Sequence, residues 1–341
     1  MKKVLLSEPI DQAGMRVLDG KVRVLVSPDP SERSVGQMMK DVHGLIVRTA
    51  TRIDRAMIEA AADLEVISRT GGGVDNVDVQ AATDRHVVVC GVKGPQDRFV
   101  AEHAVSLMTA LAKQLFYLNG EMRRGNFKAR FEYRPVGLAG KRVGLVGLGR
   151  IGRLVAEMCI RGLGMEVLGF DPYISAEDIK IPGLLFTHNL EEVIPTADFL
   201  SLHVPLSDET RGLIGREQLR LMKPTAFLIN TSRGETIDEA ALVSALRDGT
   251  IAGAALDVFA KEPPDPHHPL FQLENVILTP HTASLTRDAV AKLAEGAAEN
   301  VIDVLEGREP SYSVNWEEVK SKPKVETITN DQNSNGPNKR V

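Results

Sequence analysis

Three of the chain's eight histidines fall in one stretch, EPPDPHHPLFQLENVILTPHTAS at 262–284. A histidine can exchange a proton near neutral pH, so the stretch is a candidate for acid–base chemistry. His267 and His268 stand between prolines beside Asp265, which predicts a solvated loop, and no cysteine or second histidine follows at metal-ligand spacing. His281 instead closes the apolar run NVILTP. That run predicts a buried strand, and α/β proteins keep their ligands at the mouths of such strands.

A glycine motif in KRVGLVGLGRIGRLVAEM offers a second kind of chemistry. Gly147, Gly149 and Gly152 form G-x-G-x-x-G between a predicted strand and a predicted helix. Glycines there let the backbone approach a pyrophosphate at a helix N-terminus. Asp171 ends the next strand, about 20 residues further on, where an acid binds the ribose hydroxyls and repels a 2′-phosphate. The motif therefore predicts NAD rather than NADP; an FAD or nucleotide-sugar site, or a turn without ligand, is the alternative.

Composition limits the classes of function. A chain of 341 residues is too long for one ordinary core and fits two domains. Apolar residues make up 43%, which suffices for packed cores, whereas the net charge of −5 offers no basic face for nucleic acid. Aromatic residues, at 4%, leave few stacking platforms for bases. We therefore expect a protein that acts on small molecules and has no nucleic-acid partner.

The two cysteines and the N-terminal sequence indicate the cellular compartment of the protein. Cys90 and Cys159 lie in apolar surroundings and read as reduced core thiols. The start of the chain, MKKVLLSEPI, is too short in apolar residues for a signal peptide, and no apolar run approaches membrane-spanning length. The expectation is a cytoplasmic protein with no membrane contact.

These residues need a scaffold, and short apolar runs alternate with helix-like stretches along most of the chain. In 3–92 the runs are VLLSE, VRVLVSP, GLIVRT, LEVISRT and HVVVCGV. A second series from 141 comprises RVGLVGLG, MEVLGFDP, LLFTH, FLSLHVP, AFLINTSRG, GAALDVF and NVILTPH. Strands alternating with helices predict parallel sheets covered on both faces. Long helices are predicted at 97–119 and about 286–306, with a polar loop at 120–140.

With these motifs in order, the chain resembles the D-2-hydroxyacid dehydrogenases, nearest to their D-3-phosphoglycerate dehydrogenase branch. The resemblance rests on LIVRTATRI, SRTGGGVDNVD, GLVGLGRIG, LHVPLSDETRGLI, LINTSRGETIDEAAL, AALDVFAKEPP and VILTPHTAS, and covers roughly 1–315. It implies two Rossmann-like, doubly wound parallel-sheet domains, with the NAD domain inserted into the substrate domain. It also implies a homodimer or homotetramer formed through the NAD domain, in a short form without a regulatory domain.

The resemblance implies domain bounds as well. Segments 1–96 and 285–315 would form the substrate domain, and 97–284 the NAD-binding domain. The predicted long helices would be the hinge connections between them. The remaining 316–341 is polar and is expected to be a disordered tail.

Family members use an arginine, a glutamate and a histidine, which match Arg233, Glu262 and His281 here. Oxidation of an alcohol carbon by hydride transfer requires removal of the hydroxyl proton, and His281 would take it. The carboxylate of Glu262 would orient the ring and stabilise the imidazolium. Arg233 would bind a substrate carboxylate or polarise the carbonyl. Glu274 is expected to be a surface residue.

The resemblance also implies binding residues. Arg150 and Ile151 would place backbone amides on the pyrophosphate, and Asp257 would lie near the nicotinamide carboxamide. Other positions expected to line the cofactor are Val204, Thr231, Ser232, Arg233, His281, Ala283 and Ser284. The substrate would meet Arg48, Gly72, Gly73, Gln96 and Arg233.

The substrate stays open between several alternatives. Arg48 matches an arginine that holds phosphate in phosphoglycerate dehydrogenases, but it could instead pair with Asp54. Gln96 stands near the position where the family often has asparagine, which weakens the case for phosphoglycerate and keeps glyoxylate or hydroxypyruvate as the main rival. Formate dehydrogenase is disfavoured because it carries glutamine at the position of Glu262. An NAD-sensing protein similar to a transcriptional corepressor is the alternative of a different class.

Overall fold

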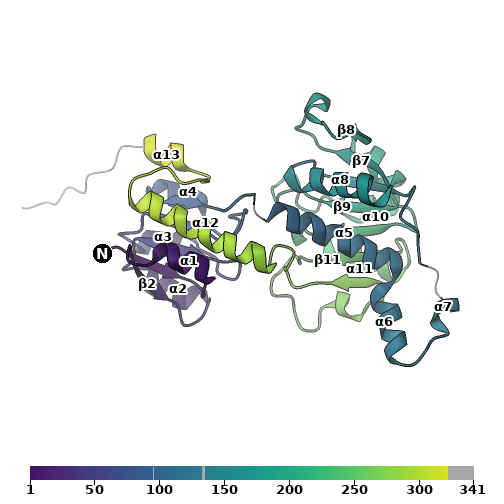
Figure 1. The fold of residues 1–341 in the computed structure, drawn as a ribbon, viewed down its shortest axis with the longest axis horizontal. Coiled ribbons are helices and arrows are strands. Elements are labelled where there is room, and N and C mark those ends of the chain that lie inside the picture. Colours follow the sequence, from purple (N-terminus) through teal and green to yellow (C-terminus); the bar gives the residue numbers. More distant parts are fainter. Residues whose placement is uncertain (95, 133–134, 322–341) are drawn as a thin grey trace, which may run out of the picture.

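The computed structural model describes residues 1–94, 96–132 and 135–321, which form two lobes side by side (Figure 1). Each lobe is built on one sheet whose strand pairs are all parallel. None of the helices among these residues is long and apolar enough to cross a membrane. Both sheets agree with the alternating strand and helix pattern of the sequence.

The first lobe holds a five-stranded sheet in the order β2-β1-β3-β4-β5. Its strands are β1 (Lys3–Leu6), β2 (Arg23–Val26), β3 (Gly44–Val47), β4 (Val66–Arg69) and β5 (Val88–Cys90). Its helices are α1 (Gln12–Leu18), α2 (Glu32–Met39), α3 (Arg55–Ala60), α4 (Val79–Asp84) and, from far along the chain, α12 (Arg287–Leu305). The central strands β3 and β4 are buried throughout, because helices cover both faces of the sheet.

The second lobe holds a seven-stranded sheet in the order β12-β11-β10-β9-β6-β7-β8. Its strands are β6 (Arg142–Val146), β7 (Glu166–Phe170), β8 (Leu184–Thr187), β9 (Phe199–Leu202), β10 (Phe227–Asn230), β11 (Gly253–Leu256) and β12 (Val276–Leu278). Its main helices are α5 (Asp97–Lys113), α8 (Arg150–Leu163), α9 (Leu190–Val193), α10 (Arg216–Leu221) and α11 (Glu239–Arg247). Short 3-10 helices lie at η1 (Ala176–Asp178), η2 (Ile194–Thr196), η3 (Gly234–Thr236) and η4 (Pro269–Gln272).

Helices cover both faces of this second sheet, as a doubly wound fold requires. Phe199 packs on one face with apolar residues of α5 and α8, whereas Leu200 packs on the other with residues of α10 and α11. The strand order reverses between β6 and β9, which creates a crevice at their carboxyl ends. Open α/β sheets bind ligands at such a crevice. The predicted fold class is confirmed.

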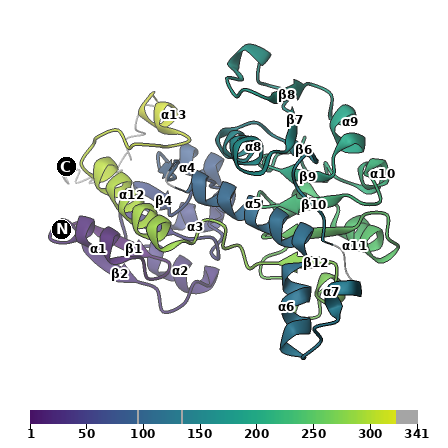
Figure 2. The same cartoon turned by 45° about the vertical axis from the view of Figure 1, so that its right-hand side comes forward.

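Helix α12 returns the chain to the first lobe, where it packs on α1 and against β3 and β4 (Figures 1 and 2). Thr286 caps its N-terminus by accepting a hydrogen bond from the backbone of Ala289, which matches the predicted start of the helix. The lobes are joined by the segment before α5 and by the segment before α12. The exact domain bounds at 96/97 and 284/285 stay a proposal.

The predicted single helix at 97–119 is broken in the structure. Gln114 adopts a left-handed conformation with φ of 51°, which ends α5 and starts α6 (Leu115–Arg123) in a new direction. The turn occurs where α5 leaves the core, since Leu111 and Ala112 are the last buried side chains. The predicted loop at 120–140 also contains a helical turn, α7 (Ala129–Glu132).

The predicted disorder of 316–341 is wrong for its first six residues. Helix α13 (Trp316–Ser321) follows a segment in which Ser313 pairs with Cys90 at the edge of β5. The buried side chain of Asn315 bonds to backbone groups of the first lobe, and Trp316 packs against its core. These contacts compensate the entropy of ordering a polar segment. The rest of the predicted tail, 322–341, lies outside the described residues.

Candidate active site

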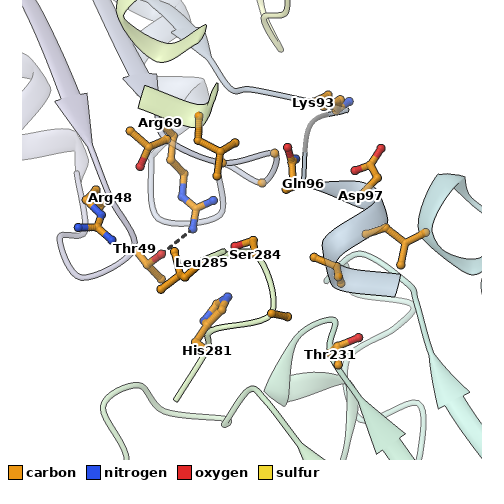
Figure 3. A pocket seen from close by; sticks show the side chains of 18 of the residues that line it. Arg48, Thr49, Arg69, Lys93, Gln96, Asp97, Thr231, His281, Ser284 and Leu285 are labelled. Atoms are coloured by element: carbon orange, nitrogen blue, oxygen red, sulfur yellow. Dashed lines mark hydrogen bonds between the residues drawn. The ribbon is translucent and has the colours of Figure 1, made fainter. Parts of the chain in front are cut away.

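A pocket lies between the lobes, where the carboxyl ends of both sheets meet (Figure 3). Most of the predicted site residues line it: Arg48, Gly72, Gly73, Gln96, Arg150, Ile151, Val204, Thr231, Ser232, Arg233, Asp257, His281, Ala283 and Ser284. Gly147, Gly149 and Gly152 lie in the turn and first helical residues around Arg150. Asp171 accepts a hydrogen bond from the backbone of that turn, and Glu262 contacts His281. The structure thus gathers the predicted residues, while their individual roles stay predictions.

His281 rises into the pocket from the loop after β12 (Figure 3). Its Nδ1 lies 2.6 Å from Oε2 of Glu262, and each of the two side chains is 28% exposed. The other oxygen of Glu262 accepts a hydrogen bond from the backbone of Phe259 at 3.1 Å, so the carboxylate is fixed on both sides. Nδ1 is thus occupied, whereas Nε2 has no hydrogen-bond partner among the described residues and can exchange a proton with a ligand.

The backbone of His281 is held in a left-handed conformation, with φ of 52°. A residue with a side chain adopts this conformation at a cost of about 1–3 kcal/mol and only where its surroundings enforce it. Here the backbone N–H of His281 donates to the carbonyl of Asp257 at 2.8 Å, and Asp257 holds the next turn of the chain. Backbone hydrogen bonds therefore fix the conformation of the loop that carries the imidazole.

The carboxylate of Asp257 is fully buried and organises this loop. It accepts hydrogen bonds from Thr279 at 2.5 Å and from the backbones of Thr282 and Ala283, each at 2.9 Å. Burial alone raises the pKa of Asp257, but hydrogen bonds from His103, Thr279 and the two backbone amides outweigh it and hold the pKa below its ordinary value. The predicted contact with the nicotinamide carboxamide remains untested.

The other histidines near the site have different surroundings. His203 also lines the pocket, but burial lowers its pKa to about 4, and its Nε2 is 2.9 Å from the hydroxyl of Ser201. His268 was expected to be solvated, and that expectation is wrong. It lies 2.8 Å from Glu239 and packs between Phe259 and Phe271, because the proline-rich loop folds back on the lobe. His281 is the pocket histidine with a carboxylate partner.

The glycine turn connects β6 to α8 at the switch point of the second sheet. A Cβ at Gly147, where φ is 96°, would lie 2.6 Å from the carbonyl oxygen of His203, and one at Gly152 would lie 2.1 Å from that of Gly147. A Cβ at Gly149, the N-cap of α8, would meet nothing within 4 Å, and the first two residues of α8, Arg150 and Ile151, line the pocket. This arrangement suits a pyrophosphate.

Asp171 stands directly after β7, beside the glycine turn, and is 9% exposed. Its two oxygens accept hydrogen bonds from the backbones of Leu148 at 2.9 Å and Tyr173 at 3.0 Å. Thr231, on the opposite wall, has a buried hydroxyl without a partner among the described residues. The open helix terminus, the placed carboxylate and the unpartnered hydroxyl fit an adenine dinucleotide.

Sequence reasoning missed Arg69, at the end of β4. It is 9% exposed, its Nη2 donates to Thr49 at 3.0 Å, and its Nε has no partner among the described residues (Figure 3). Burial is the main cause that lowers its pKa, to about 10, and repulsion from Arg233 adds to it, so the side chain stays charged at neutral pH. No carboxylate of the described residues lies within ion-pair distance of Arg69, and a buried cation in this setting suits an anionic ligand.

Arg48 follows the neighbouring strand β3 and lines the same wall of the pocket. Its Nε is 3.8 Å from Glu8, a long ion pair, whereas Asp54, the acid considered from the sequence, caps α3 instead. Val47 is the register partner of Arg69, so Arg48 and Arg69 leave adjacent strands at the same edge. Arg69 could have been predicted as a site residue from the sequence, because an arginine lies at the end of each of two apolar runs, GLIVRT and LEVISRT.

Gln96 and Arg233 complete the pocket from opposite lobes. The Nε2 of Gln96 donates to the carbonyl of Val92 at 2.8 Å, which leaves its buried Oε1 without a partner among the described residues. Arg233 reaches across the cleft to Asp75, which accepts from its Nε at 2.8 Å and its Nη2 at 2.6 Å. The cleft thus presents several charged donors and one free acceptor to a ligand.

The fold and the site define a two-lobed, dinucleotide-binding α/β protein with a histidine–carboxylate pair in its cleft. The comparisons specify the family. Residues 105–283 match the D-isomer specific 2-hydroxyacid dehydrogenase, NAD binding domain, and the chain belongs to this family of dehydrogenases.

Relatives with two different names match at similar levels. The D-3-phosphoglycerate dehydrogenase of Methanocaldococcus jannaschii is 38% identical over 315 residues, which cover 92% of this chain and 60% of that protein. The glyoxylate reductase of Korarchaeum cryptofilum is 37% identical over 327 residues, which cover 94% of this chain and 98% of that protein. This chain therefore spans less than two thirds of the first relative and nearly all of the second.

Solved structures give the same family. An NADPH-dependent glyoxylate/hydroxypyruvate reductase from Sinorhizobium meliloti, in complex with NADP and malonate, is 29% identical with a TM-score of 0.82. The match covers 92% of this chain and 96% of that one. The recognition made from the sequence motifs is confirmed.

Proposed function

We propose that this protein is an NAD-dependent oxidoreductase that interconverts a D-2-hydroxy acid and its 2-oxo acid. The observation that carries the proposal is the 2.6 Å contact between His281 and Glu262 at the edge of a pocket that continues to the glycine turn. A bound nicotinamide would supply or accept the hydride at the substrate's C2 carbon. The chain itself supplies the proton, the charges and the orientation.

In the oxidation direction, Nε2 of His281 takes the proton from the substrate hydroxyl. Glu262 then stabilises the imidazolium through Nδ1, and in reduction the same proton returns to the carbonyl oxygen. Arg233 offers charged N–H donors to the substrate carboxylate and to the oxygen on C2, where they polarise the carbonyl. Each step uses a side chain that lines the pocket or directly supports one that does.

The proposed cofactor is NAD rather than NADP. The carboxylate of Asp171 after β7 supports this preference, since it would accept the ribose hydroxyls and repel a 2′-phosphate. The solved reductase from Sinorhizobium meliloti is NADPH-dependent, so a related protein uses the phosphorylated cofactor.

For the substrate, we favour an acid with a second anionic group, such as a phosphorylated three-carbon acid. Arg48 and Arg69 support this choice, because they leave adjacent strands on the pocket wall and neither has a close carboxylate partner among the described residues. Some relatives are named D-3-phosphoglycerate dehydrogenase, and the solved reductase contains malonate, a dicarboxylate. Glyoxylate or hydroxypyruvate, each with one carboxylate, is the rival substrate and has equally similar relatives.

The test compares two substrates in Arg48→Ala and Arg69→Gln. We expect KM for 3-phosphohydroxypyruvate to rise about 10-fold to 100-fold in each variant, as for the loss of a charged hydrogen bond of about 1.5–3 kcal/mol. KM for glyoxylate should change little. Arg52→Ala, an exposed arginine of the same segment outside the pocket, is the control. Equal losses on both substrates, or no loss on either, would contradict a second anion site.

We further propose that two copies associate through α6 and α7. These helices project from the second lobe (Figures 1 and 2), and none of the side chains of α6 is buried. The projecting segment exposes five large apolar residues, Leu115, Phe116, Met122, Phe127 and Phe131. A short helix without a buried face is marginal in water, so a partner surface is required to stabilise it. In a symmetric dimer, the α6–α7 segment of each copy would cover the exposed apolar residues of the other copy.

Light scattering after size-exclusion chromatography tests the dimer. Phe116→Glu combined with Phe131→Glu should convert the wild-type dimer into monomers, because two charges would enter the interface. Leu221→Glu, an exposed apolar residue on α10, is the matched control and should remain dimeric. A monomeric wild-type protein, or an unaffected double variant, would contradict the proposal.

Cytoplasmic location is part of the same proposal. Cys90 and Cys159 are both free and buried, and burial raises the pKa of each thiol to about 12. Unpaired, unreactive core thiols are typical of proteins in reducing compartments. Fractionation of cells that express the full chain checks the location.

A further inference from the structure

Arg233 makes its closest charged contacts with the opposite lobe. Its Nε and Nη2 both donate to Oδ2 of Asp75, at 2.8 and 2.6 Å, although the two residues are 158 positions apart. Among the described residues of its own lobe, the guanidinium has one further hydrogen bond, from Nη1 to the carbonyl of Ser232 at 2.8 Å. The orientation of this arginine therefore depends on a residue from the other side of the cleft.

The remaining donors of Arg233 suit a ligand. A guanidinium has five N–H groups, and these three contacts leave one on Nη1 and one on Nη2. Arg233 lines the pocket, and the backbone of Gly73 packs directly against it, since a Cβ at Gly73 would lie 2.1 Å from Nη2 and 2.8 Å from Oδ2 of Asp75. The plane of the guanidinium is thus fixed between Asp75 and Gly73.

We propose that Asp75 is a positioning residue for Arg233 and makes its orientation depend on closure of the cleft. The inference rests on the proposed function, in which Arg233 binds the substrate carboxylate and polarises the carbonyl. When the lobes separate, the pair with Asp75 breaks and only the carbonyl of Ser232 holds a long, flexible side chain. When they close, Asp75 restores the plane that aims the two free donors at the substrate.

The exposure of the pair argues against a role in fold stability alone. The side chain of Arg233 is 27% exposed and that of Asp75 is 44% exposed. Ion pairs in such settings contribute little to the stability of a fold. Asp75 also lies close enough to Arg69 to offset part of its repulsion by Arg233, so one carboxylate supports two cations of the cleft. The effect of removing Asp75 should therefore appear in catalysis and ligand binding.

The test uses Asp75→Ala and Asp75→Asn in the full chain, with Asp63→Asn as the control. Asp63 is an exposed acid of the same lobe that does not line the pocket. We expect Asp75→Ala to lower kcat for 2-oxo acid reduction about 10-fold to 100-fold, while Tm and the Kd for NADH stay near wild type. Asp75→Asn keeps an acceptor oxygen and should recover part of the loss. Unchanged kcat, or a loss that parallels Tm and NADH binding, would overturn the inference.

Gly73→Ala disturbs the same guanidinium from the backbone side. If both changes act through Arg233, the double variant Asp75→Ala/Gly73→Ala should lose about as much kcat as the more damaged single variant. Additive losses would overturn the shared mechanism.

Calorimetry with oxalate on the NADH-loaded protein separates this inference from the proposed function. Asp75→Ala should weaken oxalate binding about 10-fold, and an equal affinity, or no binding by the wild-type protein, would overturn the role of Asp75. A wild-type protein that binds oxalate but turns over no 2-oxo acid would contradict the proposed function alone.

Discussion

The backbone N–H of His281 donates a 2.8 Å hydrogen bond to the carbonyl of Asp257, which joins the loops after two adjacent parallel strands. Asp257 follows β11 and His281 follows β12, so the sheet itself sets the distance between them. The loop after β11 then continues to Glu262, whose carboxylate contacts the imidazole of His281. Strand register thus positions the proposed catalytic pair, and we expect changes in its members to alter chemistry more than cofactor binding.

His281→Ala should lower kcat by about 10²–10⁴-fold while the Kd for NADH stays near wild type, because the acid–base group is lost and the nucleotide pocket is not. His267→Ala is the matched control, since His267 is exposed in the same stretch of chain. Steady-state kinetics and NADH fluorescence measure the two quantities. A His281→Ala enzyme with near wild-type turnover would remove His281 from the mechanism.

Glu262→Gln should shift the pH profile of activity. The change removes the counter-charge of the imidazolium, so protonated His281 becomes less favourable. Reduction of a 2-oxo acid needs the protonated form, and its alkaline limb should therefore move to lower pH. Glu274→Gln, an exposed glutamate before β12, should leave the profile in place. Superimposable profiles for Glu262→Gln and wild type would count against the pair.

Asp171→Ser should raise KM for NADH and relax discrimination against NADPH, because the carboxylate that would meet the ribose hydroxyls is removed. The ratio of kcat/KM for the two cofactors is the measurement. Since Asp171 also accepts two backbone hydrogen bonds, Tm is recorded alongside. A wild-type protein that uses NADPH as well as NADH would show that this interpretation of Asp171 is wrong.

Asp257→Asn should destabilise the fold in a pH-dependent way. The pKa of Asp257 is held below its ordinary value, so its ionised form stabilises the fold above the unfolded pKa near 3.8. That contribution is lost as pH falls through the lower, folded pKa. Denaturant titrations should give a free energy of unfolding lower by about 1.5–3 kcal/mol at pH 7, the size of a charged hydrogen bond. The gap from wild type should narrow below about pH 4; a constant gap at all pH values would contradict the assignment.

The features of the site that could be predicted from the sequence are those that local strand and helix patterns determine. The glycine turn, Asp171 and the strand ends carrying Arg233 and His281 all follow from strand and helix periodicity, because parallel strands place their carboxyl ends on one edge. Arg233 and Glu262 could be assigned only through the family resemblance, since neither an arginine after a strand nor a glutamate in a proline-rich loop has a local signal of its own.

The features that could not be predicted from the sequence depend on packing between segments that are far apart in the chain. The contact between Asp75 and Arg233 arises only when the lobes face each other. The burial of Arg69 at the end of β4 likewise depends on packing that residue type and spacing do not specify. The break at Gln114 and the helix α13 likewise reflect where the chain leaves or rejoins a core. Residue type and spacing carry no direct record of such contacts.

The most direct test of the proposed function is oxidation of NADH by the wild-type protein with 3-phosphohydroxypyruvate, hydroxypyruvate and glyoxylate. We expect turnover, with the highest kcat/KM for the phosphorylated acid, and loss of that turnover in His281→Ala. Tight NADH binding without oxidation by any of the three acids would contradict it, and would instead favour an NAD-sensing binding protein of the same fold.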